Sequence, residues 1–156
     1  MTSPRESQRA ADLVVTRTFD APRSLVWEAW TDPEQAKQWW SPETFTTPVF
    51  ESDLRVGGRI HIVMREPDGT TYPDSGVYEE IVPGERFVRY SSIELEPGKV
   101  GFEARTAVTF EDDGTGTKVT ASQWFFNVAP EAEYAPAGAH EGWRTMLDKL
   151  AAYLRR

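Results

Sequence analysis

The sequence predicts an α+β fold in which a curved antiparallel sheet of seven strands packs around one long C-terminal helix. Three observations predict it: short stretches with alternating apolar and polar residues recur, turn-forming residues separate them, and an apolar stripe at helical spacing lies near the end of the chain. With 156 residues, one domain of this kind buries about 70% of the surface of its unfolded chain. We expect residues 12–156 to form that single domain, and residues 1–11, which are polar and without periodicity, to be a flexible tail.

The first predicted elements are a strand and two short helices. Residues 12–20 alternate between apolar and polar and are rich in β-branched side chains, which indicates a strand. Pro22 suits the first turn of a helix, and apolar residues follow it at helical spacing. A second helix begins after Asp32, which can cap it with Pro33 at the first helical position, and Pro42 ends it.

The middle of the chain predicts six further strands that form a meander. Gly-Gly, Pro-Gly, Pro-Asp-Gly and Asp-Asp-Gly sequences mark the turns between them. The clearest alternation is in residues 102–110, where every second residue is apolar or threonine and the charged residues lie between them. This is typical of an antiparallel sheet with one face in water. The predicted strands are residues 46–54, 59–66, 75–82, 86–94, 102–110 and 118–126.

A long helix is predicted for residues 139–153, with a length of about 22 Å at 1.5 Å per residue. A sheet with one apolar face needs a partner, and the apolar stripe of this helix is the longest that the sequence offers. Such a pairing leaves a wedge-shaped space between sheet and helix, which the two short helices close at one end. The stripe consists of Trp143, Met146, Leu147, Leu150, Ala151 and Leu154.

Four stretches together resemble one protein family. They are "RTFDAPRSLVWEAWTDPEQAKQWW", "DLRVGGRIHIVMREPDG", "GVYEEIVPGERFV" and "EGWRTMLDKLAAYL". In this order they resemble the activator-of-heat-shock-protein-90-ATPase-like proteins of the START/birch-pollen-allergen (SRPBCC) superfamily, from about Val14 to the end of the chain. The resemblance implies the helix-grip fold, which agrees with the order of elements predicted from the pattern alone.

The resemblance also implies an internal cavity that holds lipids, polyketides or other apolar molecules. We therefore expect a non-catalytic carrier or sensor of an apolar or amphipathic small molecule. Two alternatives stay open: a cyclase- or hydratase-type enzyme acting on a polyketide-like substrate, because a few members of the superfamily are cyclases, and a chaperone-associated stress-response module. The chain is too short for the second domain with which the namesake co-chaperone grips its chaperone, so we expect at most weak stimulation of that ATPase.

The composition argues against several other classes of protein and site. The absence of cysteine excludes disulfides, thiolate metal sites and cysteine nucleophiles, and it fits a cytoplasmic protein. The formal net charge of −8 and the lack of a Lys/Arg stripe argue against a nucleic-acid partner. The N-terminal residues lack the apolar segment of a secretory signal, and no run approaches the roughly 18 apolar residues of a membrane span.

No catalytic or metal-binding constellation is visible, and we expect neither a metal nor a cofactor. The HExxH and G-x-S-x-G motifs are absent. His61 alternates with isoleucines and is expected to face water, while His140 is expected to be an exposed helix-end residue, with a general base at the cavity mouth as the alternative. Adjacent Glu79 and Glu80 point to opposite faces of a strand, so they cannot act as a pair, although one of them could point inward.

The candidate binding residues follow from strand parity and from the position of the long helix. In residues 86–94 either Tyr90 faces inward and Arg89 outward, which we favour, or Arg89 is an inward cation able to anchor a carboxylate. Gln123 shares parity with apolar residues, which suggests a hydrogen-bonding side chain in the pocket, with a surface position at the strand end as the alternative. The candidates for the cavity wall, for which ordinary core is the alternative, are Trp40, Ile62, Met64, Tyr78, Tyr90, Thr106, Gln123, Trp143 and Met146.

Three of the six tryptophans lie between Glu28 and Trp40, in the two short helices. Trp30 shares a helical face with other apolar residues, so we expect it to anchor the core. Trp39 and Trp40 diverge by about 100° around the second helix. We expect Trp39 to pack beneath this helix and Trp40 to lie nearer the cavity mouth, with core positions for both as the alternative.

Overall fold

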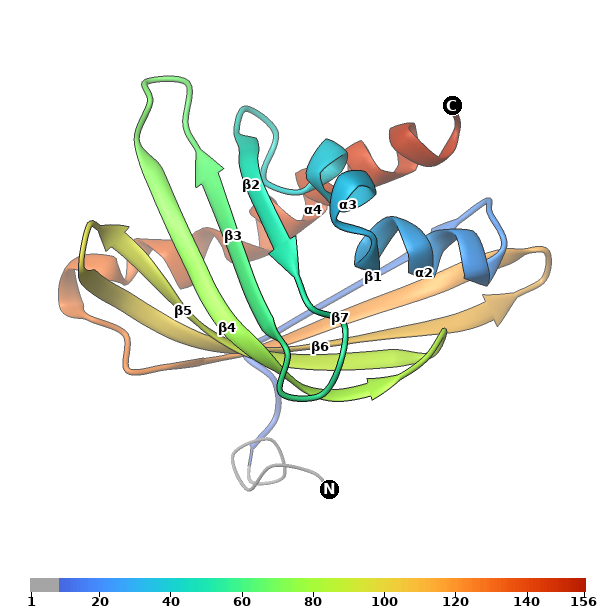
Figure 1. Cartoon of the computed structure of the whole chain (residues 1–156), viewed down its shortest axis with the longest axis horizontal. Helices are drawn as coiled ribbons and strands as arrows, with labels where there is room; N and C mark the ends of the chain where they lie inside the picture. The colour runs from blue at the N-terminus through green and yellow to red at the C-terminus, as the bar shows by residue number, and fades with distance from the viewer. Residues whose placement is uncertain (1–8) are drawn as a thin grey trace.

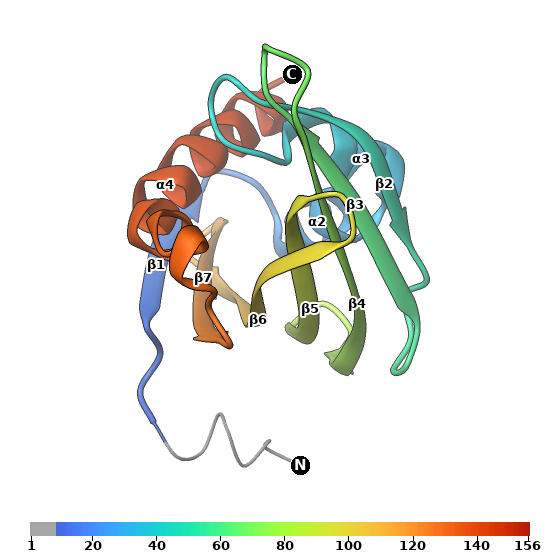
Figure 2. The ribbon, with the colours of Figure 1, turned by 90° about the vertical axis from the view of Figure 1, so that its left-hand side faces the viewer.

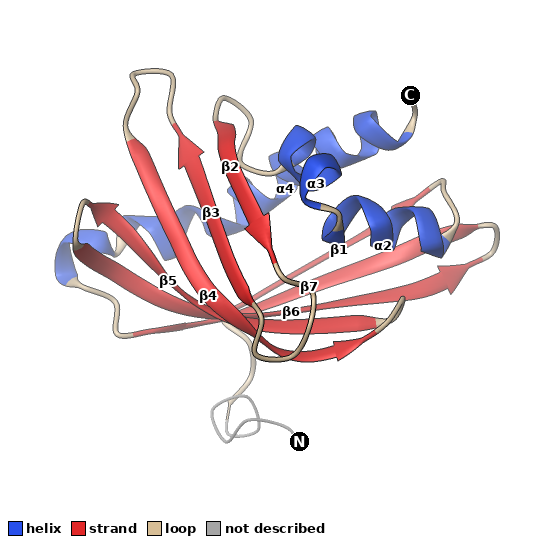
Figure 3. Ribbon diagram, in the orientation of Figure 1, coloured by secondary structure: helices blue, strands red, loops and turns tan. Residues whose placement is uncertain are grey.

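A curled sheet of seven antiparallel strands forms the body of the protein, and the helices lie on its concave side (Figures 1 and 3). The computed structural model describes residues 9–156, so most of the tail predicted for residues 1–11 lies outside the described residues. Seen from the side, the sheet is an open trough with α4 (Tyr134–Leu154) along its open side (Figure 2). The helix-grip fold predicted from the sequence is therefore confirmed.

The elements follow the predicted order. After β1 (Leu13–Phe19) come the two short helices α2 (Arg23–Thr31) and α3 (Pro33–Trp39). A short 3₁₀ turn, η1 (Pro130–Ala132), precedes α4. The meander consists of β2 (Thr46–Ser52), β3 (Arg59–Arg65), β4 (Thr71–Val82), β5 (Arg86–Glu96), β6 (Lys99–Asp113) and β7 (Gly116–Phe126).

Strands that follow one another in the chain from β2 to β7 pair side by side, and β1 closes the sheet beside β7. The strand order is β1-β7-β6-β5-β4-β3-β2, and every pairing is antiparallel. The alternation predicted for residues 102–110 is confirmed, because its apolar and threonine positions are all buried on the concave face: Phe102, Ala104, Thr106, Val108 and Phe110.

Two elements begin four or five residues earlier than predicted. Strand β4 starts at Thr71 and includes Pro73, which we had expected to lie before the strand. Pairing with β5 starts only at Asp74, so the missing N–H of Pro73 interrupts no ladder on that side. Helix α4 starts at Tyr134, five residues before the predicted start, because Pro136 lies in the first turn, where backbone N–H groups have no helical partner.

An aromatic cluster fills the half of the trough that lies under α2 and α3. Trp30 is at its centre and is 3% exposed. The Trp30 ring contacts five other aromatic rings. The nearest of these is the ring of Trp39, at 4.8 Å between centroids and with an interplanar angle of 68°. The Trp39 indole donates a hydrogen bond to the carbonyl of Ala29 at 3.0 Å, so α3 is fastened to α2. Trp30 is thus a core anchor, as we expected.

The C-terminal helix closes the trough from above. At most 1% of the surface of Leu147 and of Leu150 is exposed, and Leu154 is partly buried against the same core. Burial of two leucines with almost no remaining exposure contributes about 1.5–3 kcal/mol for each side chain. The helix is thus held by its apolar stripe, as the sequence predicted.

Not every side chain on the convex face of the sheet is exposed to water, although the alternation predicted an exposed face. Arg105 is only 2% exposed there, and its guanidinium donates two hydrogen bonds to Glu79, at 2.8 and 2.6 Å. Tyr90 lies beside it, with the Arg105 guanidinium 5.3 Å from the centre of its ring, and donates a hydrogen bond to Glu103 at 2.6 Å. The inward orientation favoured for Tyr90 is therefore wrong.

Candidate functional site

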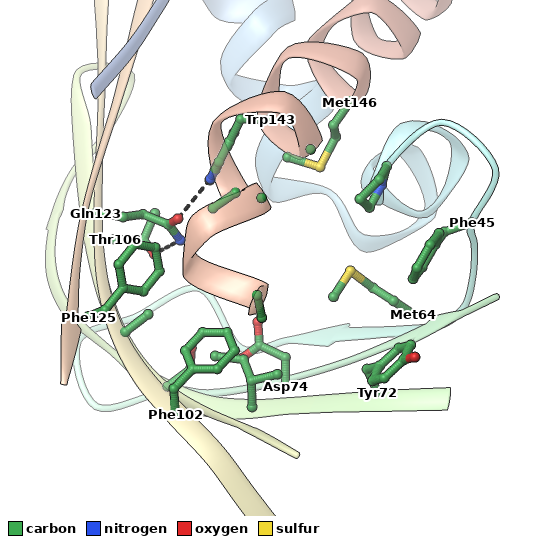
Figure 4. A pocket seen from close by; sticks show the side chains of 18 of the residues that line it. Phe45, Met64, Tyr72, Asp74, Phe102, Thr106, Gln123, Phe125, Trp143 and Met146 are labelled. Carbon is green, nitrogen blue, oxygen red and sulfur yellow. Dashed lines mark hydrogen bonds between the residues drawn. The ribbon is translucent and has the colours of Figure 1, made fainter. Parts of the chain in front are cut away.

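A cavity of about 340 Å³ lies between the sheet and the N-terminal half of α4. This is the wedge-shaped space that the order of elements predicted. Figure 4 shows its walls: Met64, Phe45 and Tyr72 lie on one side, Phe102 and Phe125 on the opposite side, and Trp143 and Met146 reach in from α4. Most of these side chains are aromatic or aliphatic, so the cavity is predominantly apolar.

The cavity exists because small residues meet there from both layers. Gly76, Ser91 and Ala104 lie in one row across β4, β5 and β6. A Cβ at Gly76 would lie 2.6 Å from the Ser91 Cβ, so only glycine fits at that position. On α4, Gly138 and Gly142 face the same space and leave it open. The other half of the trough carries large aromatic rings at the equivalent places and is solid.

An aromatic pair borders the cavity where β4 begins. The rings of Phe45 and Tyr72 are stacked, with 6.0 Å between centroids and an interplanar angle of 25°. The Tyr72 hydroxyl donates a hydrogen bond to Glu66 at 2.5 Å, and this bond is the main reason why the pKa of Tyr72 is raised. Tyr134, at the start of α4, lines the cavity but is 63% exposed, which marks the rim.

A chain of hydrogen bonds joins the helix to the floor of the cavity. The Trp143 indole donates to Gln123 Oε1 at 2.8 Å, and Gln123 Nε2 donates to the Thr106 hydroxyl at 2.9 Å (Figure 4). Both polar groups of the Gln123 amide are therefore engaged. The Thr106 oxygen accepts one of these bonds, which leaves its proton free to donate into the cavity.

Two ionisable groups lie inside this apolar space. Arg89 is 5% exposed and lines the cavity, with its guanidinium 4.8 Å from the centre of the Trp40 ring. Its Nε has no hydrogen-bond partner. Asp74 is 8% exposed; burial raises its pKa, while the charge of Arg89 and a hydrogen bond from Ser91 act in the opposite direction.

The loop between α3 and β2 forms part of the wall and is fastened to α4 by one cation. The ammonium group of Lys149 donates to the carbonyls of Ser41, Pro42 and Phe45, each at 3.1 Å. Ser41 is fully buried and has a φ of 92°, an unfavourable conformation for a residue with a side chain. We call residues 40–45 the clamped loop. It contributes Trp40, Pro42 and Phe45 to the cavity lining.

The structure brings together most of the predicted cavity residues. Three candidates do not line the cavity. Ile62 is fully buried in the core, Tyr78 packs against Phe87 and shares a hydrogen bond with Ser52, and Tyr90 lies on the convex face. The candidates that line it are Trp40, Met64, Thr106, Gln123, Trp143 and Met146.

Trp40 lines the cavity at its closed end rather than at the mouth. Its ring lies 5.9 Å from both Trp30 and Trp143, at the border of the aromatic cluster. Trp39, in contrast, is 1% exposed and packs beneath α3. The two neighbouring tryptophans thus differ in role, although Trp40 does not cover an entrance.

Sequence reasoning missed Asp74 and gave the inward position of Arg89 only as the less favoured alternative. The outward position is favoured for Arg89 because the other parity of the strand places Val88 and Tyr90 inward and the charge in water. In the structure Phe87, Ser91 and Ile93 share the parity of Arg89 and are buried with it. Asp74 lies just before the predicted strand 75–82, and no signal in that segment marks it as buried.

The remaining candidates for chemistry are peripheral. His61 shares a hydrogen bond with Ser75 at 2.8 Å on the outer side of β3, and His140 is exposed on α4. Glu80 pairs with Arg86 at 2.7 Å, and Glu79 pairs with Arg105. Within residues 9–156 no group of three His, Asp or Glu side chains could hold a metal ion, and no helix is long and apolar enough to cross a membrane.

Comparisons with known proteins agree with this geometry. The family model described as activator of Hsp90 ATPase homolog 1-like protein matches residues 20–155. A solved structure from Chromobacterium violaceum is 27% identical and covers 90% of this chain and 94% of its own, with a TM-score of 0.78. One from Nitrosomonas europaea is 28% identical, covering 92% and 93%, with a TM-score of 0.74. A search of curated proteins gave no match.

A third solved structure shows the same fold at lower identity. It is described as the AHSA1 protein from Silicibacter pomeroyi, and it is 23% identical to this chain. The two chains overlap over 92% and 96% of their lengths, with a TM-score of 0.77.

Proposed function

The chain belongs to the family of activator of Hsp90 ATPase homolog 1-like proteins, and from this premise we propose that it is a non-catalytic carrier or sensor that encloses one apolar or amphipathic small molecule. The START-like fold of this family is that of small-molecule binders. The proposed place of binding is the cavity between the sheet and α4.

The composition of the cavity wall carries the proposal. A volume of about 340 Å³ is within the range of sites for small molecules, which are lined mainly by apolar side chains with a few polar groups. Here phenylalanine and tryptophan side chains and two methionines provide apolar contact, and methionine adapts its shape to an irregular ligand. The polar groups are few and are held in place by hydrogen bonds or by burial. These aromatic side chains include Phe45, Phe102, Phe125 and Trp143, and the methionines are Met64 and Met146.

A pair of matched variants on α4 tests where the ligand binds. Ala139 lines the cavity, whereas Ala137, two residues away, is exposed. We expect Ala139→Phe to fill the cavity and abolish binding of the neutral dye N-phenyl-1-naphthylamine, measured by fluorescence titration. Ala137→Phe should bind the dye like the wild type. Equal dye binding by both variants would contradict a site in this cavity.

The natural ligand can be sought directly. Native mass spectrometry of protein purified gently from its own cells should show an added mass that disappears on denaturation. The Ala139→Phe variant purified in the same way should lack that mass. An adduct that persists in this variant would place the molecule elsewhere on the protein.

Asp74 favours a second candidate function, a cyclase- or hydratase-type reaction. Burial raises the pKa of this carboxyl, and a raised pKa makes a carboxyl better suited to act as a general acid. A ligand whose mass changes on incubation with the wild type but not with Asp74→Asn would support catalysis. Recovery of unchanged ligand from both proteins would support a carrier.

The family description also names a chaperone ATPase, and the absence of cysteine suits the reducing cytoplasm. We propose the cytoplasm as the compartment and keep a chaperone-associated role as an alternative. Addition of this protein at micromolar concentration to the chaperone should leave the ATPase rate close to its basal value. Strong stimulation would favour the chaperone role over the carrier.

A further inference from the structure

The closed end of the cavity holds a buried cation that the described residues leave without a hydrogen bond. Arg89 is 5% exposed, and neither a hydrogen bond nor an ion pair joins it to another side chain of residues 9–156. A guanidinium has five N–H donors and stays charged in proteins. Removal of such a group from water is unfavourable unless a partner of opposite charge or several acceptors compensate it.

The contacts that Arg89 does make compensate only part of this cost. Its guanidinium lies 4.8 Å from the centre of the Trp40 ring, a cation–π contact that uses one face of the group. The in-plane N–H donors, which recognise carboxylates in a fork, are not occupied by this contact. The in-plane donors with which the Arg89 guanidinium could bind a carboxylate are therefore unused.

Asp74 does not fill this role in the structure. In the sheet, Asp74 pairs with Ile93, whereas Arg89 pairs with Tyr78, so the two lie at different levels of β4 and β5. They interact through their charges but form no ion pair. Burial, moreover, favours the neutral form of Asp74. An uncharged Asp74 would leave the closed end with a net positive charge.

A second donor lies beside Arg89. Thr106 is the partner of Arg89 on β6 and is 2% exposed. Its oxygen already accepts a hydrogen bond from Gln123, and Gln123 is in turn fixed by the Trp143 indole. The network fixes the position of the Thr106 oxygen, and its O–H group can donate to an acceptor placed at Arg89.

We propose that the ligand is an amphipathic organic acid, whose carboxylate or comparable anionic group binds Arg89 and Thr106 while its apolar part fills the cavity toward Phe102, Phe125 and Met64. This inference rests on the proposed carrier function and specifies the chemical class of its ligand. The position of the anionic group at the closed end means that the apolar part points to the rim.

Two dyes with the same ring system test the inference. N-Phenyl-1-naphthylamine is neutral, and 8-anilinonaphthalene-1-sulfonate carries one negative charge on the same skeleton. We expect the wild type to bind the sulfonate more tightly by about tenfold or more, which corresponds to about 1.4 kcal/mol. Displacement of the dye by 4-phenylbutanoate and by 4-phenylbutanamide should show the same preference for the acid.

Variants assign the preference to Arg89. Arg89→Met should bind the two dyes about equally, and Arg89→Lys should keep a part of the preference because the charge remains. Arg59→Met removes an exposed positive charge on β3 and should behave like the wild type. Asp74→Asn should bind the sulfonate at least as tightly as the wild type, because it removes a carboxyl from the cavity.

The outcomes separate this inference from the proposed function. Tight binding of the neutral dye without preference for the sulfonate or for 4-phenylbutanoate would overturn the anionic ligand and leave the carrier function standing. Absence of any dye binding to the wild type would overturn both. A preference that persists in Arg89→Met, with that variant folded by circular dichroism, would overturn the role of Arg89. The comparison of acid and amide in the wild type stays decisive even where Arg89→Met fails to fold.

Discussion

Removal of the Lys149 ammonium should loosen one wall of the cavity without removing a side chain from its lining. We consider Lys149→Met, because methionine keeps an unbranched apolar stem and loses the charge. Three hydrogen bonds to backbone carbonyls disappear, from Ser41, Pro42 and Phe45. Ser41, which has a φ of 92°, then loses one of the contacts that hold its strained backbone.

The magnitude follows from these contacts. Hydrogen bonds contribute about 1 kcal/mol each to net stability, which gives about 3 kcal/mol for the three bonds. Desolvation of the ammonium, which lowers the pKa of Lys149, reduces this gain. We therefore expect a loss of about 2 kcal/mol, which corresponds to a decrease in Tm of about 4–8 °C for a chain of this size.

Two measurements check this prediction. Thermal unfolding gives the change in Tm, and stopped-flow fluorescence gives the rate at which N-phenyl-1-naphthylamine leaves the cavity. We expect faster dissociation from Lys149→Met, because the clamped loop supplies part of the wall. Lys37→Met, which removes an exposed charge on the neighbouring helix α3, is the matched control. An unchanged Tm together with an unchanged dissociation rate would refute the role of Lys149 as a fastening for the loop.

Three further predictions concern the core, the buried carboxyl and the exposed histidine. Trp30→Ala should cost about 3–5 kcal/mol in urea unfolding, because a buried aromatic side chain leaves a cavity; a loss below about 1 kcal/mol would contradict its central position. For Asp74, burial raises the folded-state pKa above the ordinary 3.8, so the folded state binds more protons and stability falls as the pH rises through this interval. Asp74→Asn should therefore gain stability over the wild type at pH 7 and lose that advantage toward pH 3, and a difference independent of pH would show that the raised pKa is wrong. His140→Ala should change stability by less than about 0.5 kcal/mol and leave dye binding intact; loss of a turnover that the wild type shows would make the enzyme the leading candidate.

The fold could be predicted from the sequence because the hydrophobic periodicity and the positions of turn-forming residues indicate the same elements along the chain. The alternation in residues 102–110 and the stripe of α4 are both set by burial against one large core, which local patterns record well. The starts of α4 and β4 were less accurate. Proline is tolerated in the first turn of a helix and at the start of a strand, because no backbone N–H is required there, so both elements extend across Pro136 and Pro73 beyond their predicted starts.

The cavity was predicted only in part because its polar residues break the pattern on which the prediction relies. Arg89 and Asp74 are charged residues at inward positions, and an alternation rule places charges outside. We expected Tyr90 to face inward because its ring is apolar, but the ring lies on the convex face, where it packs with Phe126 and Arg105. Either parity of β5 was compatible with its sequence, because Val88 and Tyr90 offer apolar side chains at one parity and Phe87 and Ile93 at the other.

The row of paired residues Tyr78, Arg89, Thr106 and Gln123 crosses β4 to β7 at the border between the aromatic cluster and the cavity. Each of these strands therefore supplies one segment to a solid region and another to a hollow one. Substitutions beyond the row can change ligand chemistry while the packed region keeps the chain folded. Natural selection can act on the cavity lining and on stability at separate positions of the same strand, so members of this family can share one architecture and still differ in the shape and polarity of the space beside it.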